Sequence, residues 1–427
     1  MGRARRKTFG AAALVASAAA CSGTPEGTVS LVTGDEVDVF SRAPAAVTLV
    51  AEKVALDGAR TEIARAELPV DSVRLGAQQR TEVGALAISG LDATGQVVVR
   101  GETLLVQWGA LENTTLEVFV QRTGELARLP RGPEAFDPAV TAVVSGRFIL
   151  AANGSATILY DLLALKPLAS PPVLPRSARS LASVGTAVLV IDDEGATTFD
   201  LSDAASYPLD PPVGGAFGEV AGGATVTAPD GTQYVVGATR AAGGPTARVL
   251  VIDPEGASSF AALTAPREGA CATFVPGRGL VVVGGDAGAA GAELLAPGAS
   301  LATPLPFPAD PVKGCGATAL DNGHVAVAGG GDAPVRVLDL ACAAECAPAT
   351  WADAVPLARA EAYALAPDAA FILGDDATGA TRAYRATPAG AREVPLRVPR
   401  RGARLVPTAI GAPVVVGGAA GIEQYLD

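Results

Sequence analysis

Arginines and aspartates recur at two fixed places in a repeated part of the sequence, and they are the first candidates for chemistry. The arginines precede a short apolar run, and the aspartates follow a break of small residues. Together they could form a charged ring that binds a peptide, glycan or acidic ligand, because a guanidinium is a bidentate donor. Structural ion pairing is the alternative. The predicted binding face consists of Arg179, Arg267, Arg359, Arg401, Asp193, Asp286, Asp332 and Asp375.

Four cysteines of the later sequence suggest cross-links. Cys342 and Cys346 enclose three residues, and in an exported chain such a pair predicts a local disulfide. Zinc is the alternative, but it needs about four ligands. Cys271 and Cys315 could bridge neighbouring repeats, yet they are one residue out of register, so we expect their side chains to face oppositely. Whether they are bonded or are buried free thiols stays open.

His324 is the only histidine of the chain. One histidine cannot build a multi-histidine metal centre. It could serve a single Ser-His-Asp triad, but no matching serine motif accompanies it. We therefore predict no metal, no cofactor and no identifiable catalytic residue, and a structural role for His324 at the start of a strand.

The N-terminus is typical of an export signal. Residues 3–7 are basic, residues 9–16 are apolar, and small residues lead to Cys21. The apolar run is too short to span a bilayer. Residues 1–20 are therefore predicted to be a signal peptide, and residues 21–27 a flexible tether.

The residues around Cys21 resemble the lipobox of bacterial lipoproteins. Three alanines precede Cys21, although Ala18 stands where leucine is usual, which leaves ordinary secretion as the alternative. The resemblance implies that Cys21 carries a lipid anchoring the chain in a membrane. Because Ser22 rather than aspartate follows, it also implies an outer-membrane lipoprotein of the cell envelope.

Composition limits the classes of partner that the chain could bind. The formal net charge is −12, and the basic residues near the N-terminus would be lost with the signal peptide. Nucleic-acid binding needs clustered lysine and arginine, so we predict no nucleic-acid partner. The hydrophobic content of 49% is sufficient for a packed core.

One unit recurs seven times in residues 123–427: a turn, an apolar strand, a small-residue break and a further strand. The breaks lie 40 to 47 residues apart, at Ala151, Ile191, Gly237, Gly284, Gly329, Gly374 and Gly417. A proline-punctuated fourth strand follows in six units, and proline suits an edge strand. Four antiparallel strands per unit predict a seven-bladed β-propeller.

The seventh unit ends after its third strand. Residues 124–130 look like a free fourth strand that lies before the first unit. An open ring would expose a sheet edge. We therefore predict that this early segment completes the last blade.

Several units resemble the kelch family. A double glycine follows an apolar strand in three units, an aromatic-Asp pair ends the third strand at Tyr160-Asp161, and Trp351 stands at the fourth-strand tryptophan position. The resemblance implies a kelch-like propeller. It is degenerate, because the other units lack the double glycine and the tryptophan recurs in only one.

Residues 28–122 lack the repeat. They contain six or seven short β-rich runs separated by turn signals, which favours a small immunoglobulin-like β-sandwich. The Cys…Trp…Cys pattern of that fold is missing. The predicted fold class is therefore all-β, with a sandwich followed by a propeller.

Two functions fit this organisation. The first is a membrane-anchored binding or scaffold lipoprotein whose propeller mouth holds a protein or polysaccharide. The alternative is a propeller-based polysaccharide lyase or hydrolase, although catalysis is the weaker expectation. Two carboxyl groups from different blades, roughly 5–9 Å apart in the mouth, would favour the enzyme.

Overall fold

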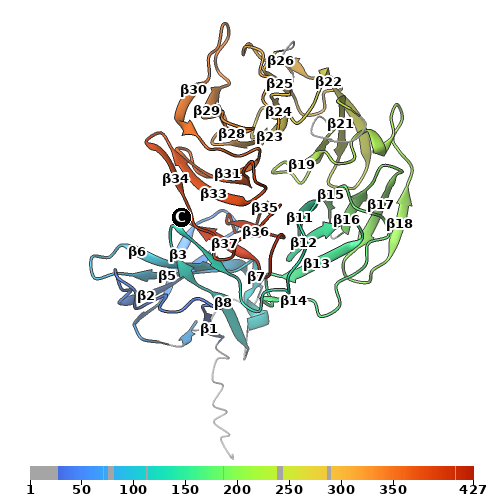
Figure 1. Ribbon diagram of the computed structural model, residues 1–427. Helices are drawn as coiled ribbons and strands as arrows, with labels where there is room; N and C mark the ends of the chain where they lie inside the picture. Colours follow the sequence, from blue (N-terminus) through green and yellow to red (C-terminus); the bar gives the residue numbers. More distant parts are fainter. Residues whose placement is uncertain are drawn as a thin grey trace, which may run out of the picture.

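The computed structural model describes residues 27–427 apart from 71, 76–80, 112–113, 186, 238–243, 286–289 and 409. The predicted signal peptide, most of the tether, Cys21 and Asp286 therefore lie outside the described residues. Helix is limited in the described part to two short 3-10 turns, η1 (Trp108–Leu111) and η2 (Phe217–Glu219). All other elements are strands (Figure 1), so the predicted all-β class is confirmed.

The first part of the described chain forms a β-sandwich of two sheets. One sheet contains β1 (Thr28–Val32), β4 (Ser72–Arg74) and β8 (Thr115–Phe119). The other contains β2 (Thr48–Val54), β3 (Arg60–Glu67), β5 (Val83–Leu91), β6 (Val97–Glu102) and β9 (Gln121–Arg122), with β7 (Val106–Gln107) beside β5. Buried side chains from both sheets, such as Val29, Val118, Leu49 and Ile88, form one core. The two sheets therefore pack face to face.

Seven sheets of four strands each make up the rest of the described chain. The first three contain β11 (Thr141–Ser145), β12 (Phe148–Asn153), β13 (Ala156–Asp161), β14 (Lys166–Pro167); β15 (Ser180–Val184), β16 (Ala187–Ile191), β17 (Ala196–Asp200), β18 (Ser206–Leu209); β19 (Ala224–Thr227), β20 (Gln233–Val236), β21 (Thr246–Ile252) and β22 (Ser258–Arg267). The next three contain β23 (Cys271–Val275), β24 (Gly279–Val283), β25 (Ala292–Leu295), β26 (Thr303–Pro304); β27 (Cys315–Ala319), β28 (His324–Gly329), β29 (Pro334–Asp339), β30 (Ala349–Ala354); β31 (Arg359–Ala366), β32 (Ala369–Asp375), β33 (Thr381–Thr387) and β34 (Gly390–Glu393). The last contains β35 (Arg404–Pro407), β36 (Pro413–Val416), β37 (Glu423–Leu426) and β10 (Glu125–Arg128).

These sheets form a closed ring. Their first strands contact one another in succession, from β11 through β15, β19, β23, β27 and β31 to β35, and β35 contacts β11 again. Figure 1 shows the sheets arranged radially around a centre. Each sheet buries both faces against its neighbours, which is the arrangement of a β-propeller.

The last sheet is completed by a strand from near the start of the described chain. β10 pairs antiparallel with β37, with Leu126 opposite Tyr425. Both side chains are fully buried, and Phe371 of the preceding sheet packs against them. The prediction that residues 124–130 supply the missing strand is confirmed for Glu125–Arg128.

The double glycine of the repeat has a local cause. Gly284 and Gly285 follow β24 with φ of 81° and 80°, a conformation that side chains disfavour. A Cβ on Gly284 would lie 2.6 Å from the Val312 carbonyl oxygen, and one on Gly285 would lie 2.8 Å from the Glu268 carbonyl oxygen. The glycines thus let neighbouring loops approach the end of the strand.

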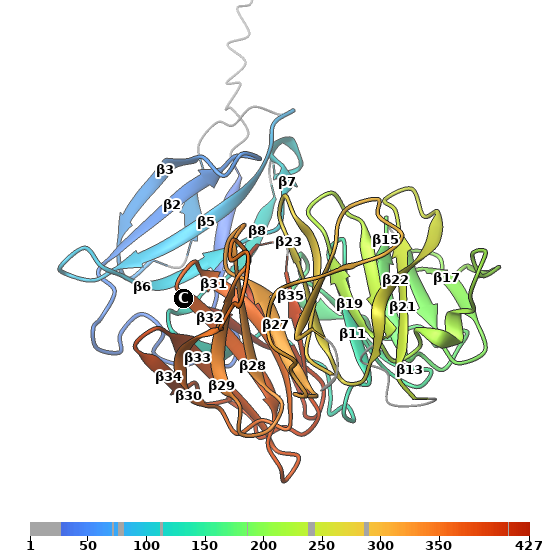
Figure 2. The same ribbon diagram turned by 90° about the horizontal axis from the view of Figure 1, so that it is seen from above.

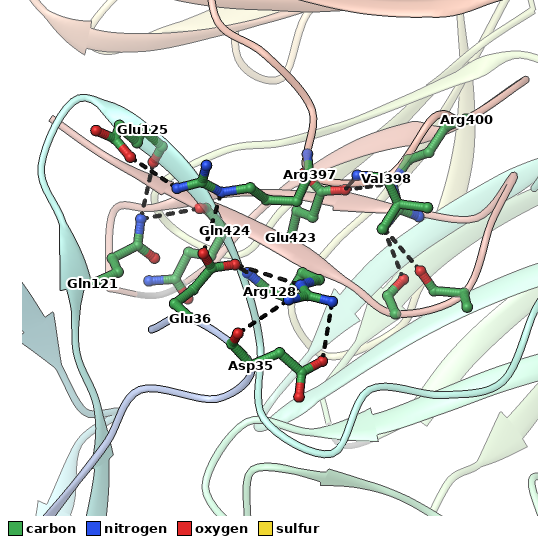
Figure 3. A network of polar contacts seen from close by, with 12 residues as sticks. Asp35, Glu36, Gln121, Glu125, Arg128, Arg397, Val398, Arg400, Glu423 and Gln424 are labelled. Atoms are coloured by element: carbon green, nitrogen blue, oxygen red, sulfur yellow. Dashed lines mark hydrogen bonds and ion pairs between the residues drawn. The ribbon is translucent and has the colours of Figure 1, made fainter. Parts of the chain in front are cut away.

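A polar network joins the sandwich to the ring (Figure 3). Arg397, ahead of the last sheet, contacts Glu36 of the sandwich at 3.4 Å and Glu125 of β10 at 2.8 Å. Arg42 also bonds Glu125 at 2.8 Å, and Glu36 accepts from the backbone N–H of Arg128. The network anchors the sandwich beside the closing sheet, where Figure 2 also shows it on one side of the ring.

Candidate functional site

One face of the propeller gathers the loops that the sequence singled out. Arg359 begins β31 and lies opposite Asp375, which ends β32. This register brings the start of a first strand beside the turn between the second and third strands. The predicted arginine and aspartate groups therefore share a face in this sheet, and we call it the loop face.

A network of ion pairs lies on the loop face. The Arg359 guanidinium contacts Asp375 at 2.8 Å and Glu361 at 2.9 Å, and Glu361 contacts Arg404 of the next sheet at 2.8 Å. Arg404 also donates to the carbonyl oxygen of Ala139, which precedes β11. Three consecutive sheets are thus tied together across the point where the ring closes.

The network keeps its central cation charged. Burial works to lower the pKa of Arg359, but the neighbouring Glu361 and Asp375 carboxylates outweigh it, and the pKa is raised. These rim charges consequently hold the loops in place, in agreement with the structural alternative considered for the sequence.

The second sheet of the ring repeats the pairing at a more exposed place. Arg179 contacts Asp193 at 3.2 Å, with side chains that are 31% and 52% exposed. Arg176, another of the recurring arginines, pairs with Asp192 at 3.0 Å. Arg179 and Asp193 therefore remain accessible to a partner on the loop face.

Arg267 requires a correction. Its side chain is 0% exposed and pairs with Glu293, which is also 0% exposed, at 2.8 Å. Its remaining nitrogens donate to the carbonyl oxygens of Gly284 and Ala290, both at 2.6 Å. Arg267 ends β22 and is neutralised by Glu293 on β25, the third strand of the next sheet, so it is enclosed and does not belong to an exposed binding face.

Arg400 has the same arrangement in the last sheet. It pairs with Glu423 at 3.0 Å, both side chains are 0% exposed, and Nη1 donates to the Gly417 carbonyl oxygen. The sequence analysis missed this role. The signal is a glutamate on the third strand, since Glu293 and Glu423 occupy corresponding places after the glycine break.

The other predicted residues have different surroundings. Arg401 is exposed, and its Nη1 donates to the Thr378 carbonyl oxygen at 3.3 Å. Asp332 is also exposed, two residues before β29. Asp286 lies outside the described residues. The accessible members of the predicted face are therefore Arg179, Asp193, Asp332 and Arg401.

Both cysteine pairs are bonded in the structure. The Sγ atoms of Cys342 and Cys346 are 2.00 Å apart, and those of Cys271 and Cys315 are 2.13 Å apart. The offset between Cys271 and Cys315 does not prevent their bridge. Side chains that meet between two stacked sheets must leave opposite faces of the repeat, and an offset of one residue provides that.

His324 contacts only its own turn. Its Nδ1 lies 2.9 Å from Oδ2 of Asp321, on a hairpin whose backbone N–H groups also bond that carboxylate. No cluster of three or more histidine, cysteine, aspartate or glutamate side chains that could hold a metal occurs in the described ranges. Nor does any described helix have the length and apolar character needed to cross a bilayer.

Fold and loop face together define an all-β propeller protein with a charged rim. No protein-family model matches the chain, and no curated protein matches its sequence. Similar solved structures include the WD40 domain of Neurospora crassa Pan2, with 11% identity over 68% of this chain and 90% of that chain and a TM-score of 0.44. A chain of a mitotic checkpoint complex has 10% identity, 71% and 95% coverage and a TM-score of 0.48. A chain from BBS1N in complex with ARL6DN has 11% identity, 70% and 94% coverage and a TM-score of 0.46. Similarities of this size transfer no function.

Proposed function

We propose that the chain is a binding or scaffold lipoprotein of the bacterial cell envelope. In this proposal residues 1–20 are the signal peptide, Cys21 carries the lipid, and residues 21–27 form the tether. Residues 28–122 are an immunoglobulin-like sandwich that acts as a spacer. Residues 123–427 are a seven-bladed, kelch-like propeller whose loop face holds a protein or a polysaccharide.

The rim network is the observation that supports binding best. Arg359, Glu361 and Arg404 link three sheets through contacts of 2.8 to 2.9 Å, including the hydrogen bond from Arg404 to the Ala139 carbonyl oxygen. Loops fixed before a partner arrives lose little conformational entropy on binding. The exposed Arg179, Asp193, Asp332 and Arg401 then offer charges of both signs, which suits recognition of a polar partner.

The lyase or hydrolase alternative is not favoured. Its expected mark is a pair of carboxyl groups contributed by different blades. Glu361 and Asp375 both belong to the sheet of β31 and β32, and they share the Arg359 guanidinium. Two carboxylates bound to one arginine resemble a structural network more than an acid and a base.

Fractionation tests the anchoring. A Cys21→Ala variant should move from the membrane pellet to the soluble envelope fraction, because the acyl chains that bind the bilayer are lost. A Ser22→Ala variant is the matched control and should stay in the pellet. Equal membrane retention of both variants would remove the lipid from the proposal.

Capture on the loop face tests the binding. Purified chain would be incubated with solubilised envelope, and retained proteins and polysaccharides compared with those held by an Arg179→Ala/Arg401→Ala variant. We expect the variant to lose most of the captured material. Asp230→Ala and Asp368→Ala, in hairpins joining first and second strands at the opposite ends of the sheets, are the control. Undiminished capture by the loop-face variant would contradict the proposal.

A further inference from the structure

A pocket lies between two neighbouring sheets of the ring, β23–β26 and β27–β30. Its volume is about 200 Å³. A cavity of about 150 Å³ holds a benzene-sized molecule, so this pocket accepts a group at least that large. Most of its lining is apolar, and two charged side chains complete it: Val283, Gly291, Phe307, Pro308, Ala309, Asp310, Arg336, Leu338 and Pro348.

Arg336 is the polar feature that distinguishes the pocket. Its side chain is 12% exposed and Asp310, its ion-pair partner, is 16% exposed. Within the described chain Nη2 of Arg336 bonds Asp310, and neither Nε nor Nη1 has an acceptor. Arg267 and Arg400, which are fully enclosed, bond a glutamate and two or more carbonyl oxygens.

Unused guanidinium donors in an enclosed place favour an acceptor from outside. A guanidinium has five N–H groups, and Nε and Nη1 of Arg336 are not among the buried atoms that lack a partner in the described chain, so they remain accessible to a ligand. Asp310 cannot turn to satisfy the rest, because its Oδ1 accepts from the backbone N–H of Val312 at 3.0 Å. The remaining donors of Arg336 are suited to a carboxylate, whose two oxygens match its geometry.

Two disulfides brace the pocket. Val283 lies beside the Cys271–Cys315 bridge, with its carbonyl oxygen 3.7 Å from Sγ of Cys271. On the other side, the backbone N–H of Cys346, which is bonded to Cys342, donates to the carbonyl oxygen of Pro306, next to Phe307. Cross-linked walls keep the pocket formed without a ligand, which lowers the entropy lost on binding.

We propose that this pocket binds a carboxylate attached to an apolar group of about the size of an aromatic ring. The carboxylate pairs with Arg336, and the apolar group lies against Phe307 and Leu338. Such a group is available from the C-terminal residue of a peptide or from a free aryl acid. The inference rests on the proposed binding function, since it names a ligand class for a pocket next to the loop that carries Asp332.

Calorimetric titration of the purified chain tests the pocket with defined probes. N-acetyl-phenylalanine represents a peptide C-terminus, phenylacetate represents a free aryl acid, and N-acetyl-phenylalaninamide lacks the carboxylate. We expect at least one acid to bind, and to bind at least tenfold more tightly than the amide. Preference for the first acid identifies a peptide end, and preference for the second identifies a small acid.

Variants locate the binding. Arg336→Met keeps the apolar stem and should weaken binding of the acid at least tenfold, whereas Arg65→Met, an exposed change in the sandwich, should leave the affinity unchanged. If Arg336→Met fails to fold, the comparison of acid and amide on the unaltered chain still decides. Equal binding of acid and amide, or no saturation by either acid, would overturn the inference. None of these outcomes would affect loss of capture by the Arg179→Ala/Arg401→Ala variant, so the two proposals fail separately.

Discussion

Two arginines of this propeller have all their acceptors inside the protein. Arg267 and Arg400 are completely enclosed, and each is neutralised by a glutamate and bonded to carbonyl oxygens at the glycine break. Burying a charge costs several kcal/mol unless it is paired and hydrogen-bonded. The glutamate on the third strand therefore allows an arginine to take a buried place that an apolar side chain would otherwise fill.

Removing Arg267 should be strongly destabilising. We expect Arg267→Met to lower the free energy of unfolding by about 3–5 kcal/mol, because Glu293 would remain buried without its partner. Urea denaturation followed by circular dichroism measures the change. The double variant Arg267→Met/Glu293→Leu should recover much of the loss, since it leaves no unpaired charge.

Arg179→Met provides the matched control for Arg267→Met. Arg179 pairs with Asp193 at an exposed place, and exposed pairs contribute about 0–1 kcal/mol. Equal effects of the two substitutions would show that the buried pair is not needed for stability.

Residue types were easier to predict from the sequence than residue environments. The recurrence of arginine before the first strand correctly indicated pairing with acids on one face, as Arg359 and Asp375 show. Burial of Arg267 was not foreseen, because its partner Glu293 lies on a strand that the repeat pattern treats as apolar. Arg336 was missed because a single pair with Asp310 has no signature in the repeat.

The repeat pattern predicted strands well because each unit must alternate strand and turn. The breaks at Gly284 and Gly417 follow β24 and β36 as expected. The bond between Cys271 and Cys315 was judged on the wrong criterion, namely that both side chains should leave the same face of their sheets. Stacked sheets require the opposite, and that requirement is visible only when neighbouring units are considered together.

Leu126 tests the closing strand. It is fully buried with Phe371 and Tyr425, so Leu126→Ala should lower the free energy of unfolding by about 2–5 kcal/mol. Chemical denaturation monitored by fluorescence or circular dichroism provides the measurement. Leu105→Ala is the control, because Leu105 is 55% exposed and its truncation removes little packing. A negligible effect of Leu126→Ala would argue that the last sheet is stable without β10.

The contact between sandwich and ring combines ion pairs with apolar packing, since Phe119 of β8 shares a buried cluster with Ala127 and Leu129. Arg128 and Arg397 contact Glu36 and Glu125, as Figure 3 shows, and Arg42 also contacts Glu125. The sequence predicted both parts of the molecule but not this contact, because its members are scattered through the chain and follow no period. A sandwich held in this way keeps a constant orientation to the propeller.

Acid should weaken this junction. Burial works to raise the pKa of Glu125, but Arg42 and Arg397 outweigh it and the pKa is lowered. A carboxyl group with a lowered pKa stabilises the folded state above its unfolded value of about 4.3, and that stabilisation is lost as pH falls through the folded value.

The Glu125→Gln variant isolates this effect. Its melting temperature should lie below that of the unaltered chain near pH 7, and the gap should close as the pH is lowered below about 4. Melting curves between pH 7 and pH 3 provide the comparison. Glu67→Gln, an exposed change in the sandwich, is the control and should give no such trend. A constant gap across the range would mean that Glu125 acts through something other than its charge.

Closure of the ring by β10 also affects how copies of the chain meet one another during refolding. Its partner β37 lies at the far end of the described chain, so this ladder joins distant residues and is slow to form. Until then β10 presents free backbone donors and acceptors that the β37 of another molecule satisfies equally well. Refolding at high concentration should therefore yield domain-swapped dimers in which two rings exchange this strand, whereas dilution should favour monomers.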